Sequence, residues 1–148
     1  MNCLNFKMRK LTRLLSRIYD AELSKAGLKT TQFTLLCHVL GYGSAKLGDI
    51  ALRMGLEQST MSRNIRPLID VGWITYSSGD DARQRLLSLT GEGRSKQAEA
   101  LVYWDIAQEK IKILLGPSHF NQLDLIVNSC VDKLHQSDPT LSKDDSNV

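Results

Sequence analysis

The sequence predicts a mainly α-helical fold with one small β-sheet of two or three strands. Apolar residues recur at helical spacing in several segments of the 148-residue chain. Two short segments between residues 73 and 89 are instead rich in strand-forming residues, and turn residues separate them. The length fits a single domain with helical extensions.

The composition is that of a globular chain, with 42% hydrophobic and 24% charged residues. No apolar run reaches the roughly 20 residues that span a bilayer, and residues 1–10 lack the apolar region of a signal peptide. We therefore expect a cytoplasmic protein. Cys3, Cys37 and Cys130 are too widely spaced for a disulfide framework or a zinc site, so we expect no metal and no cofactor.

The first element is a helix over about residues 6–25, where Met8, Leu11, Leu15 and Ile18 form an apolar stripe. Four basic residues lie off this stripe: Arg9, Lys10, Arg13 and Arg17. Gly27 supplies a stop, and Thr30 or Thr31 is expected to cap a second helix that ends at residues 41–44.

A helix-turn-helix pattern follows, with a short helix over about residues 46–54 and a longer one over about 58–71. Ala51 is small where the helices cross, and Gly55 suits the left-handed backbone of the turn. Pro67 conflicts with a continuous second helix and predicts a kink, or a helix end near Arg66.

The two strand-like segments, residues 73–77 and 85–89, are expected to form a hairpin beside this motif, which makes a winged helix. Thr90 is expected to cap a long helix that Gly116 and Pro117 stop near residue 115. A last helix covers about residues 118–136. Cys37 and Cys130 lie on apolar helix faces and are expected to be buried.

The net charge of +3 hides an uneven distribution. Residues 1–30 carry seven basic and two acidic side chains, residues 46–94 carry seven and six, and residues 95–148 carry five and eight. The central segment is almost neutral. A nucleic-acid contact there would depend on where individual arginines point.

In this order, the segments resemble the MarR family of bacterial transcriptional regulators. The resemblance rests on residues 47–51, 58–63 and 72–74, and on residues 81–90. The last run has the family's wing signature, an Asp, an Arg two residues later, then a basic residue and Leu-Thr before the next helix. The resemblance covers about residues 6–136. The resemblance implies a winged helix-turn-helix fold with N- and C-terminal dimerisation helices.

The second helix of the motif is expected to enter the major groove of DNA, which accommodates an α-helix. Gln can pair with adenine, Arg with guanine, and hydroxyl groups with bases or phosphates. The expected contacts on this helix are Gln58, Ser59, Thr60, Ser62, Arg63 and Arg66. The alternative is an ordinary solvated helix face.

The hairpin carries three further candidates. Arg83 lies at the predicted tip, where an arginine can enter a narrow minor groove. Asp81 is expected to orient the wing by pairing with a nearby arginine, and Arg85 is expected to contact the DNA backbone. The alternative for Asp81 and Arg83 is an exposed turn without a ligand.

The resemblance also implies a two-fold dimer built from the terminal helices, and therefore a pseudo-palindromic operator. The expected interface residues are Leu11, Leu15, Phe120, Leu123, Val127 and Leu134. The predicted division of the chain is a dimerisation helix at 1–30, a DNA-binding domain at 31–90, dimerisation helices at 91–136 and a disordered tail at 137–148. The alternative is a monomer in which both terminal helices complete the core.

Regulation is expected through a signal received between these parts. Family members often bind small aromatic acids there, and the candidate lining residues are Arg17, Tyr19, His38 and Tyr42. Some members sense peroxide through an N-terminal cysteine, which makes Cys3 a candidate redox residue. Asn5 and Thr30 depart from the pattern of that subgroup.

The sequence thus favours a dimeric, DNA-binding transcriptional regulator, expected to be a repressor released by a small aromatic or anionic effector or by oxidation. The alternative is a winged-helix protein-interaction module without DNA binding. An enzyme is not expected. His38, His119 and His135 fall in no catalytic or metal-binding arrangement, and no glycine-rich phosphate loop is present.

Overall fold

The computed structural model describes residues 2–78 and 85–138 of the chain. In chain order its elements are α1 (Leu4–Leu23), η1 (Ser24–Ala26), α2 (Thr30–Tyr42), β1 (Ala45–Lys46), α3 (Leu47–Arg53), α4 (Gln58–Asp70), β2 (Ile74–Ser78), β3 (Arg85–Leu89), α5 (Gly91–Leu115) and α6 (Pro117–Ser137). The expected mainly helical winged fold is confirmed. In the part of the chain described, no helix is long and apolar enough to cross a membrane.

The sheet has three antiparallel strands in the order β1-β3-β2. Leu87 of β3 is its centre, because it pairs with Ala45 on one side and with Tyr76 on the other, and it is fully buried. The sequence prediction missed β1, which is only two residues long.

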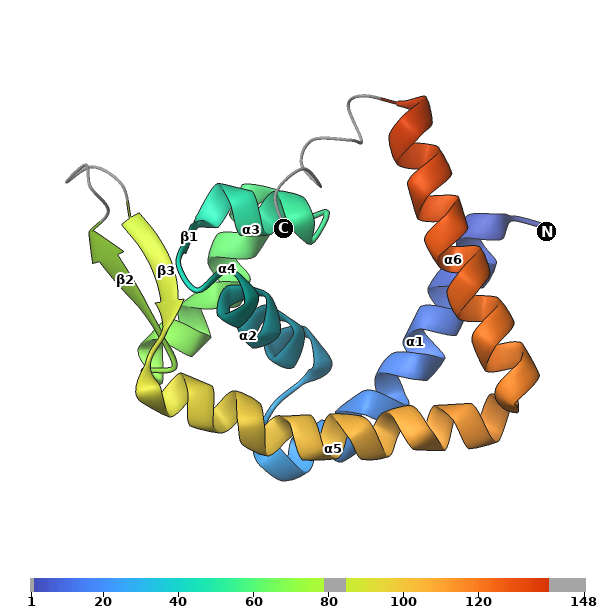
Figure 1. Ribbon diagram of the computed structural model, residues 1–148, viewed down its shortest axis with the longest axis horizontal. Coiled ribbons are helices and arrows are strands. Elements are labelled where there is room, and N and C mark those ends of the chain that lie inside the picture. The colour runs from blue at the N-terminus through green and yellow to red at the C-terminus, as the bar shows by residue number, and fades with distance from the viewer. Residues whose placement is uncertain (1, 79–84, 139–148) are drawn as a thin grey trace.

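Two regions can be distinguished in Figure 1. The first, here called the core lobe, comprises α2, β1, α3, α4, β2 and β3. The second, the helical arm, comprises α1, α5 and α6, and α5 runs under the lobe before α6 turns upward from its far end (Figure 1). The largest fully buried side chains come mostly from the lobe: Leu35, Leu36, Val39, Ile50, Met61, Ile65, Leu68, Ile74 and Leu87.

The turn between α3 and α4 forms as the sequence predicts. Gly55 adopts a left-handed backbone with φ of 63°. The Leu56 amide donates to the Ala51 carbonyl at 2.8 Å, and Ala51 is buried between the helices. These contacts fix where α4 begins relative to α3.

Of the two effects expected of Pro67, an early end of α4 near Arg66 is wrong, because the helix continues through Pro67 to Asp70, close to the expected end at about residue 71. The proline removes one helical hydrogen bond, but its ring lies on the exposed side. Beyond it, the Val71 amide donates to the Pro67 carbonyl, and the Trp73 amide donates to the Leu68 carbonyl. Burial of Leu68 and these two bonds hold the last turn together.

The expected cap of α2 is also corrected. Lys29 is the N-cap residue, and Thr30 is the first residue of the helix. The Thr30 amide and hydroxyl both donate to the Asp20 carboxylate, at 2.7 and 2.6 Å. A carboxylate of α1 therefore accepts a hydrogen bond from a backbone amide in the first turn of α2, and this contact joins the arm to the lobe.

Thr90 caps α5 as predicted, since its hydroxyl accepts a bond from the Gly93 amide at 3.0 Å. The same hydroxyl donates to the Gly72 carbonyl at 2.6 Å. A Cβ at Gly93 would lie 2.0 Å from the Trp73 carbonyl oxygen, so only glycine fits. This joint fixes α5 against the end of α4 and the base of the hairpin.

The helix α6 contains no buried residue. Cys130 is exposed, so the expectation that it is buried is wrong for the single chain. Cys37 is half-buried, and burial raises the pKa of its thiol although Gln97 donates a hydrogen bond to it. The predicted tail falls mostly on residues 139–148, outside the described residues, and α6 itself extends to Ser137.

Candidate nucleic-acid interface

The helix α4 has two sharply different faces. Its inner face consists of Met61, Ile65 and Leu68, each at most 1% exposed. The outer face carries the predicted DNA contacts. Gln58, Ser59, Ser62, Arg63 and Arg66 are exposed, and Thr60 is partly covered. The buried face fixes the rotation of the helix, so the outer face presents polar and basic groups in a defined order.

Three of these side chains have neighbours that orient them. The Gln58 amide nitrogen lies against Gly48, where a Cβ would approach it to 2.8 Å. Arg63 donates to the Thr60 hydroxyl at 3.5 Å, and Arg66 lies 4.0 Å from the Asp70 carboxylate. Both contacts are long and exposed, so they cost little to exchange for another acceptor.

The wing is described only in part. Asp81 and Arg83 lie outside the described residues, so their predicted roles stay predictions. Arg85 begins β3 and is exposed, with its guanidinium carbon 5.5 Å from the centre of the Tyr76 ring. The hairpin packs beside α4, as Figure 1 shows.

The four candidate effector residues lie on two helices and have separate neighbours. Tyr19 on α1 donates to Gln108 and stacks on Trp104 at 6.3 Å, and burial raises the pKa of its phenol. His38 contacts the Thr34 carbonyl at 2.8 Å. Tyr42 lies under Arg53, and Arg17 is exposed. None of the four lines the pocket that runs along α6.

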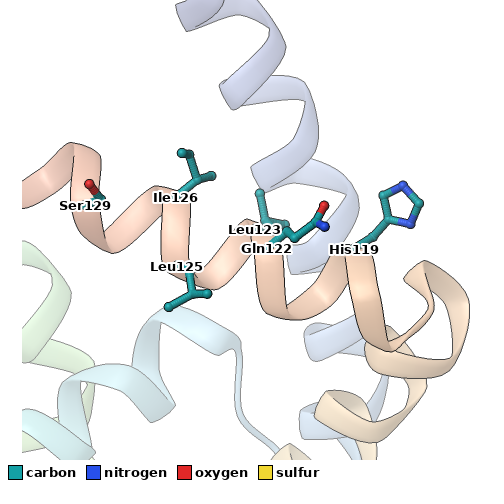
Figure 2. Close-up of a pocket in the computed structure, with 6 residues that line it drawn as sticks. All are labelled: His119, Gln122, Leu123, Leu125, Ile126 and Ser129. Carbon is teal, nitrogen blue, oxygen red and sulfur yellow. The ribbon is translucent and has the colours of Figure 1, made fainter.

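A pocket is found instead along α6. It is lined by His119, Gln122, Leu123, Leu125, Ile126 and Ser129. All six come from this single helix, and Figure 2 shows Leu125 and Ile126 pointing in different directions. The hollow is therefore a feature of an uncovered helix rather than an enclosed small-molecule site.

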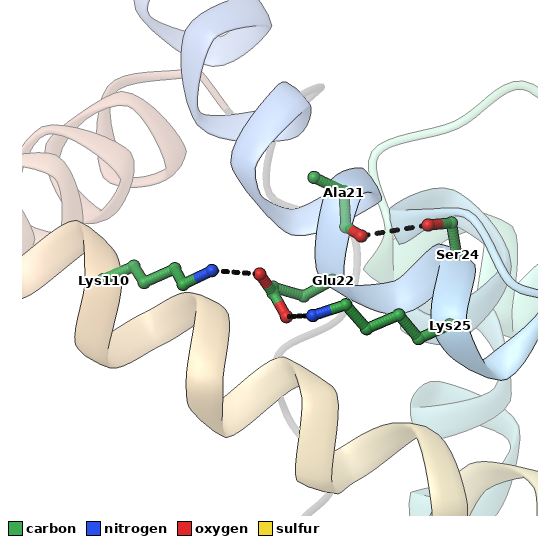
Figure 3. Close-up of polar contacts among 5 residues, drawn as sticks. All are labelled: Ala21, Glu22, Ser24, Lys25 and Lys110. Carbon is green, nitrogen blue, oxygen red and sulfur yellow. Dashed lines mark hydrogen bonds and ion pairs between the residues drawn. The ribbon is translucent and has the colours of Figure 1, made fainter.

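A buried carboxylate joins α1 to α5. Glu22 is 5% exposed at its side chain and accepts hydrogen bonds from Lys110 of α5 and from Lys25 at 2.6 Å (Figure 3). The bond from Lys110, then the bond from Lys25, holds the pKa of Glu22 below its usual value against the effect of burial. This clamp sets how α1 lies on α5.

Sequence reasoning missed Glu22, although a signal was present. It continues the apolar stripe of α1 four residues after Ile18, and a carboxylate at such a position requires a buried partner. Gly93 and the ring of Tyr76 were missed as well. Nothing in the local pattern indicates that α5 packs directly on the Trp73 backbone, because that contact is set by the tertiary fold.

The candidate redox residue Cys3 is a half-buried free thiol at the N-cap of α1. The start of α1, which Cys3 precedes, lies away from α4 in Figure 1. In the described residues no group of three or more His, Cys, Asp or Glu is arranged to hold a metal ion.

Known proteins match this architecture. The sequence model of the MarR family matches residues 26–84, which include the lobe elements α2, β1, α3, α4 and β2. Over these residues the chain is similar to the MarR family. A MarR-type regulator, MosR of M. tuberculosis, was solved in complex with DNA and is 26% identical, with a TM-score of 0.70 over 87% of this chain and 98% of that one.

Two further relatives are less similar in sequence or extent. A MarR mutant from E. coli in complex with operator DNA is 16% identical, with a TM-score of 0.78 over 86% of this chain and 92% of that one, and supports the fold. The HTH-type transcriptional regulator YwoH of Bacillus subtilis, itself uncharacterized, is 29% identical over 87 residues. The match covers 59% of this chain and 64% of YwoH. MosR, MarR and YwoH are regulators, in agreement with the expectation that the chain is not an enzyme.

Proposed function

We propose that the protein is a sequence-specific DNA-binding regulator of transcription that acts as a homodimer on a pseudo-palindromic operator. The observation that carries the proposal is the division of α4 into a buried apolar face and an exposed polar face with Arg63 and Arg66. MosR, which shares 26% of its residues with this chain, binds DNA in its crystal structure. The DNA ligand makes the cytoplasm the expected location.

In this proposal α4 reads bases in the major groove. Gln58, Ser59, Ser62 and Arg63 lie in its first two turns, the part of a recognition helix that contacts base edges. Thr60, which is partly covered, and Arg66, which comes a turn later, are expected to contact phosphates. The wing supplies Arg83 for the minor groove and Arg85 for the backbone, with Asp81 as the orienting residue.

The dimer is supported by the apolar surface of the helical arm. Leu125 of α6 and Ile113 and Leu114 of α5 are each about 70% exposed or more. Among the expected interface residues, Leu134 is exposed, whereas Leu11 and Leu15 are already half-covered within the chain. A second copy laid against α6 and α1 would remove this apolar surface from water. The division into residues 1–30, 31–90 and 91–136 describes this assembly.

We further propose repression that ends when a signal changes the spacing of the two recognition helices. The effector must bind the non-binding arrangement more tightly, because equal affinity for both arrangements shifts nothing. A small aromatic or anionic compound is proposed near Arg17, Tyr19, His38 and Tyr42, and oxidation is proposed at Cys3. A Cys3→Ser protein that still leaves DNA after peroxide treatment would place an oxidation sensor elsewhere.

The test is selection of bound fragments from a bacterial genomic library, followed by titration of the selected fragment at several salt concentrations. A DNA-binding regulator should select one or a few fragments with an inverted repeat. Its affinity should fall steeply as salt rises, since phosphate contacts release counterions. Absence of binding to any fragment at low salt would contradict the proposal and favour a winged-helix protein-interaction module.

A further inference from the structure

Two exposed arginines of the core lobe each lie over the ring of a tyrosine. The guanidinium carbon of Arg85 is 5.5 Å from the centre of the Tyr76 ring, and that of Arg53 is 5.2 Å from the centre of the Tyr42 ring. Both distances are within the roughly 6 Å at which a cation and an aromatic ring attract each other. A guanidinium stacked in this way keeps its N–H donors, which point out along its edge, available to another acceptor.

The pairing of Tyr76 with Arg85 follows from the strand register. Tyr76 is opposite Leu87, and Arg85 precedes Leu87 by two residues, so the two side chains are diagonal neighbours on one face of the hairpin. Tyr76 is 39% exposed, whereas Leu87 beside it is fully buried. The outer part of the Tyr76 ring therefore serves less to fill the core than to carry the arginine.

The second pair lies where the helix-turn-helix begins. Tyr42 is the last residue of α2 and packs against the core, so its ring is fixed. Arg53 is the last residue of α3 and is exposed, five residues before Gln58 opens α4. In a helix-turn-helix the first helix crosses the DNA backbone while the second enters the groove. Arg53 is thus carried by the element that faces phosphates.

We propose that Arg53 and Arg85 are DNA-phosphate contacts and that Tyr42 and Tyr76 are the residues that position them. The proposal rests on the DNA binding proposed above, and it adds Arg53 and both tyrosines to the interface. A free arginine loses rotamer freedom when it binds a phosphate, and a ring that already holds the guanidinium reduces that loss. Phosphate contacts of this kind fix the register of the protein without reading sequence.

The test is a double-mutant cycle on each pair, with affinity measured on the DNA fragment that the wild-type protein selects. Arg85→Ala and Arg53→Ala should each lower the slope of log affinity against log salt by about one for each phosphate that the arginine binds. Tyr76→Leu and Tyr42→Leu should each weaken binding by about two- to fivefold per subunit. Tyr76→Phe and Tyr42→Phe should bind like the wild type, because the ring remains.

The cycle separates positioning from folding. In the Arg85→Ala background, Tyr76→Leu should cause no further decrease in affinity, and the same holds for Tyr42→Leu in the Arg53→Ala background. Lys112→Ala is the matched control. Lys112 also lies over a ring, that of Phe120, but at the corner of α5 and α6 away from α4 (Figure 1). Its removal should leave the salt slope unchanged.

The failures of the two proposals differ. Binding by the wild type together with unchanged affinity and salt slope in both arginine variants would overturn the inference and leave the proposed function intact. Equal decreases in affinity from the tyrosine variants with and without the arginine would overturn the positioning role. If Tyr42→Leu does not fold, Arg53→Ala decides that pair. A wild type that binds no DNA would overturn both proposals.

Discussion

The helices α4 and α6 are both amphipathic, but only α4 has an apolar face that the chain itself covers. Met61 and Leu68 of α4 are completely buried, whereas Leu125 and Ile126 of α6 are 69% and 60% exposed. The core lobe is therefore complete within one chain. The position of α6 is held mainly by its junction with α5, and its apolar surface is left exposed by the chain. The core is thus complete in the lobe and incomplete in the arm.

The variant with the largest expected effect disrupts the contact between α5 of the arm and the core lobe. Gly93→Ala places a Cβ 2.0 Å from the Trp73 carbonyl oxygen, and backbone on both sides prevents relaxation. We expect a decrease of about 4 kcal/mol in the free energy of unfolding, measured by urea denaturation.

The matched control is Gly91→Ala, two residues earlier in the same helix. A Cβ at Gly91 meets nothing within 4 Å, and alanine favours helix over glycine. This variant should be as stable as the wild type or slightly more stable. Equal stability of the two variants would mean that α5 does not pack on the Trp73 backbone.

The second prediction concerns a variant that should weaken the proposed dimer without affecting the core lobe. Leu134→Glu puts a charge into the expected interface on both copies and should weaken the dimer by about 3 kcal/mol, or roughly a hundredfold in Kd. Sedimentation velocity would measure the change. Asn128→Glu adds the same charge to the polar side of α6 and should leave the dimer intact. A wild-type protein that is monomeric at high concentration would rule out this role of α6.

The third prediction concerns a variant that should weaken DNA binding without changing the stability of the fold. Arg63 is exposed, and its contact with Thr60 is long, so Arg63→Ala should leave the urea midpoint unchanged. It should weaken binding to the selected fragment by about 1–3 kcal/mol and relax the preference at one base position in each half-site. Uniform weakening across all sequences would instead indicate that Arg63 contacts a phosphate.

The sequence predicted the elements of the lobe well, because each depends on local signals. Thr90 as a helix cap and Gly55 in the turn follow from residue type and position, and the structure confirms both. Two signals misled. Pro67 does not end α4 because Leu68 is buried beyond it. Thr30 does not cap α2 because it is the first residue of the helix, and its amide donates to Asp20 of α1. Contacts between distant segments decided both cases.

The arm was harder to predict because its environment is incomplete. Cys130 lies on an apolar face that a single chain does not cover, so periodicity alone suggested burial where the structure has exposure. For the candidate site, α4 supplied an exposed face as expected, whereas the candidate effector residues have separate neighbours. An effector site between two copies would not be recognisable from residue types on one chain.

The smallest expected effect concerns the Glu22 clamp, which holds α1 against α5 within the helical arm. Lys25 and Lys110 are each about half exposed, so water weakens both ion pairs even though Glu22 is buried. Because the pKa of Glu22 is lowered in the folded state, its stabilising contribution is full above the ordinary pKa of 4.5. That contribution disappears as pH falls through the lower folded value. Glu22→Gln should therefore be less stable than the wild type near neutral pH.

The difference between the two proteins should shrink below about pH 4.5, as the wild-type carboxylate becomes protonated and resembles the amide. Urea midpoints measured for both proteins from about pH 3 to about pH 8 would show this convergence. A difference independent of pH would mean that Glu22 acts by shape rather than charge. In that case the position of α1 on α5 would depend on apolar packing, and α1 would keep that position when the clamp is neutralised, with the Asp20–Thr30 bonds still joining it to α2.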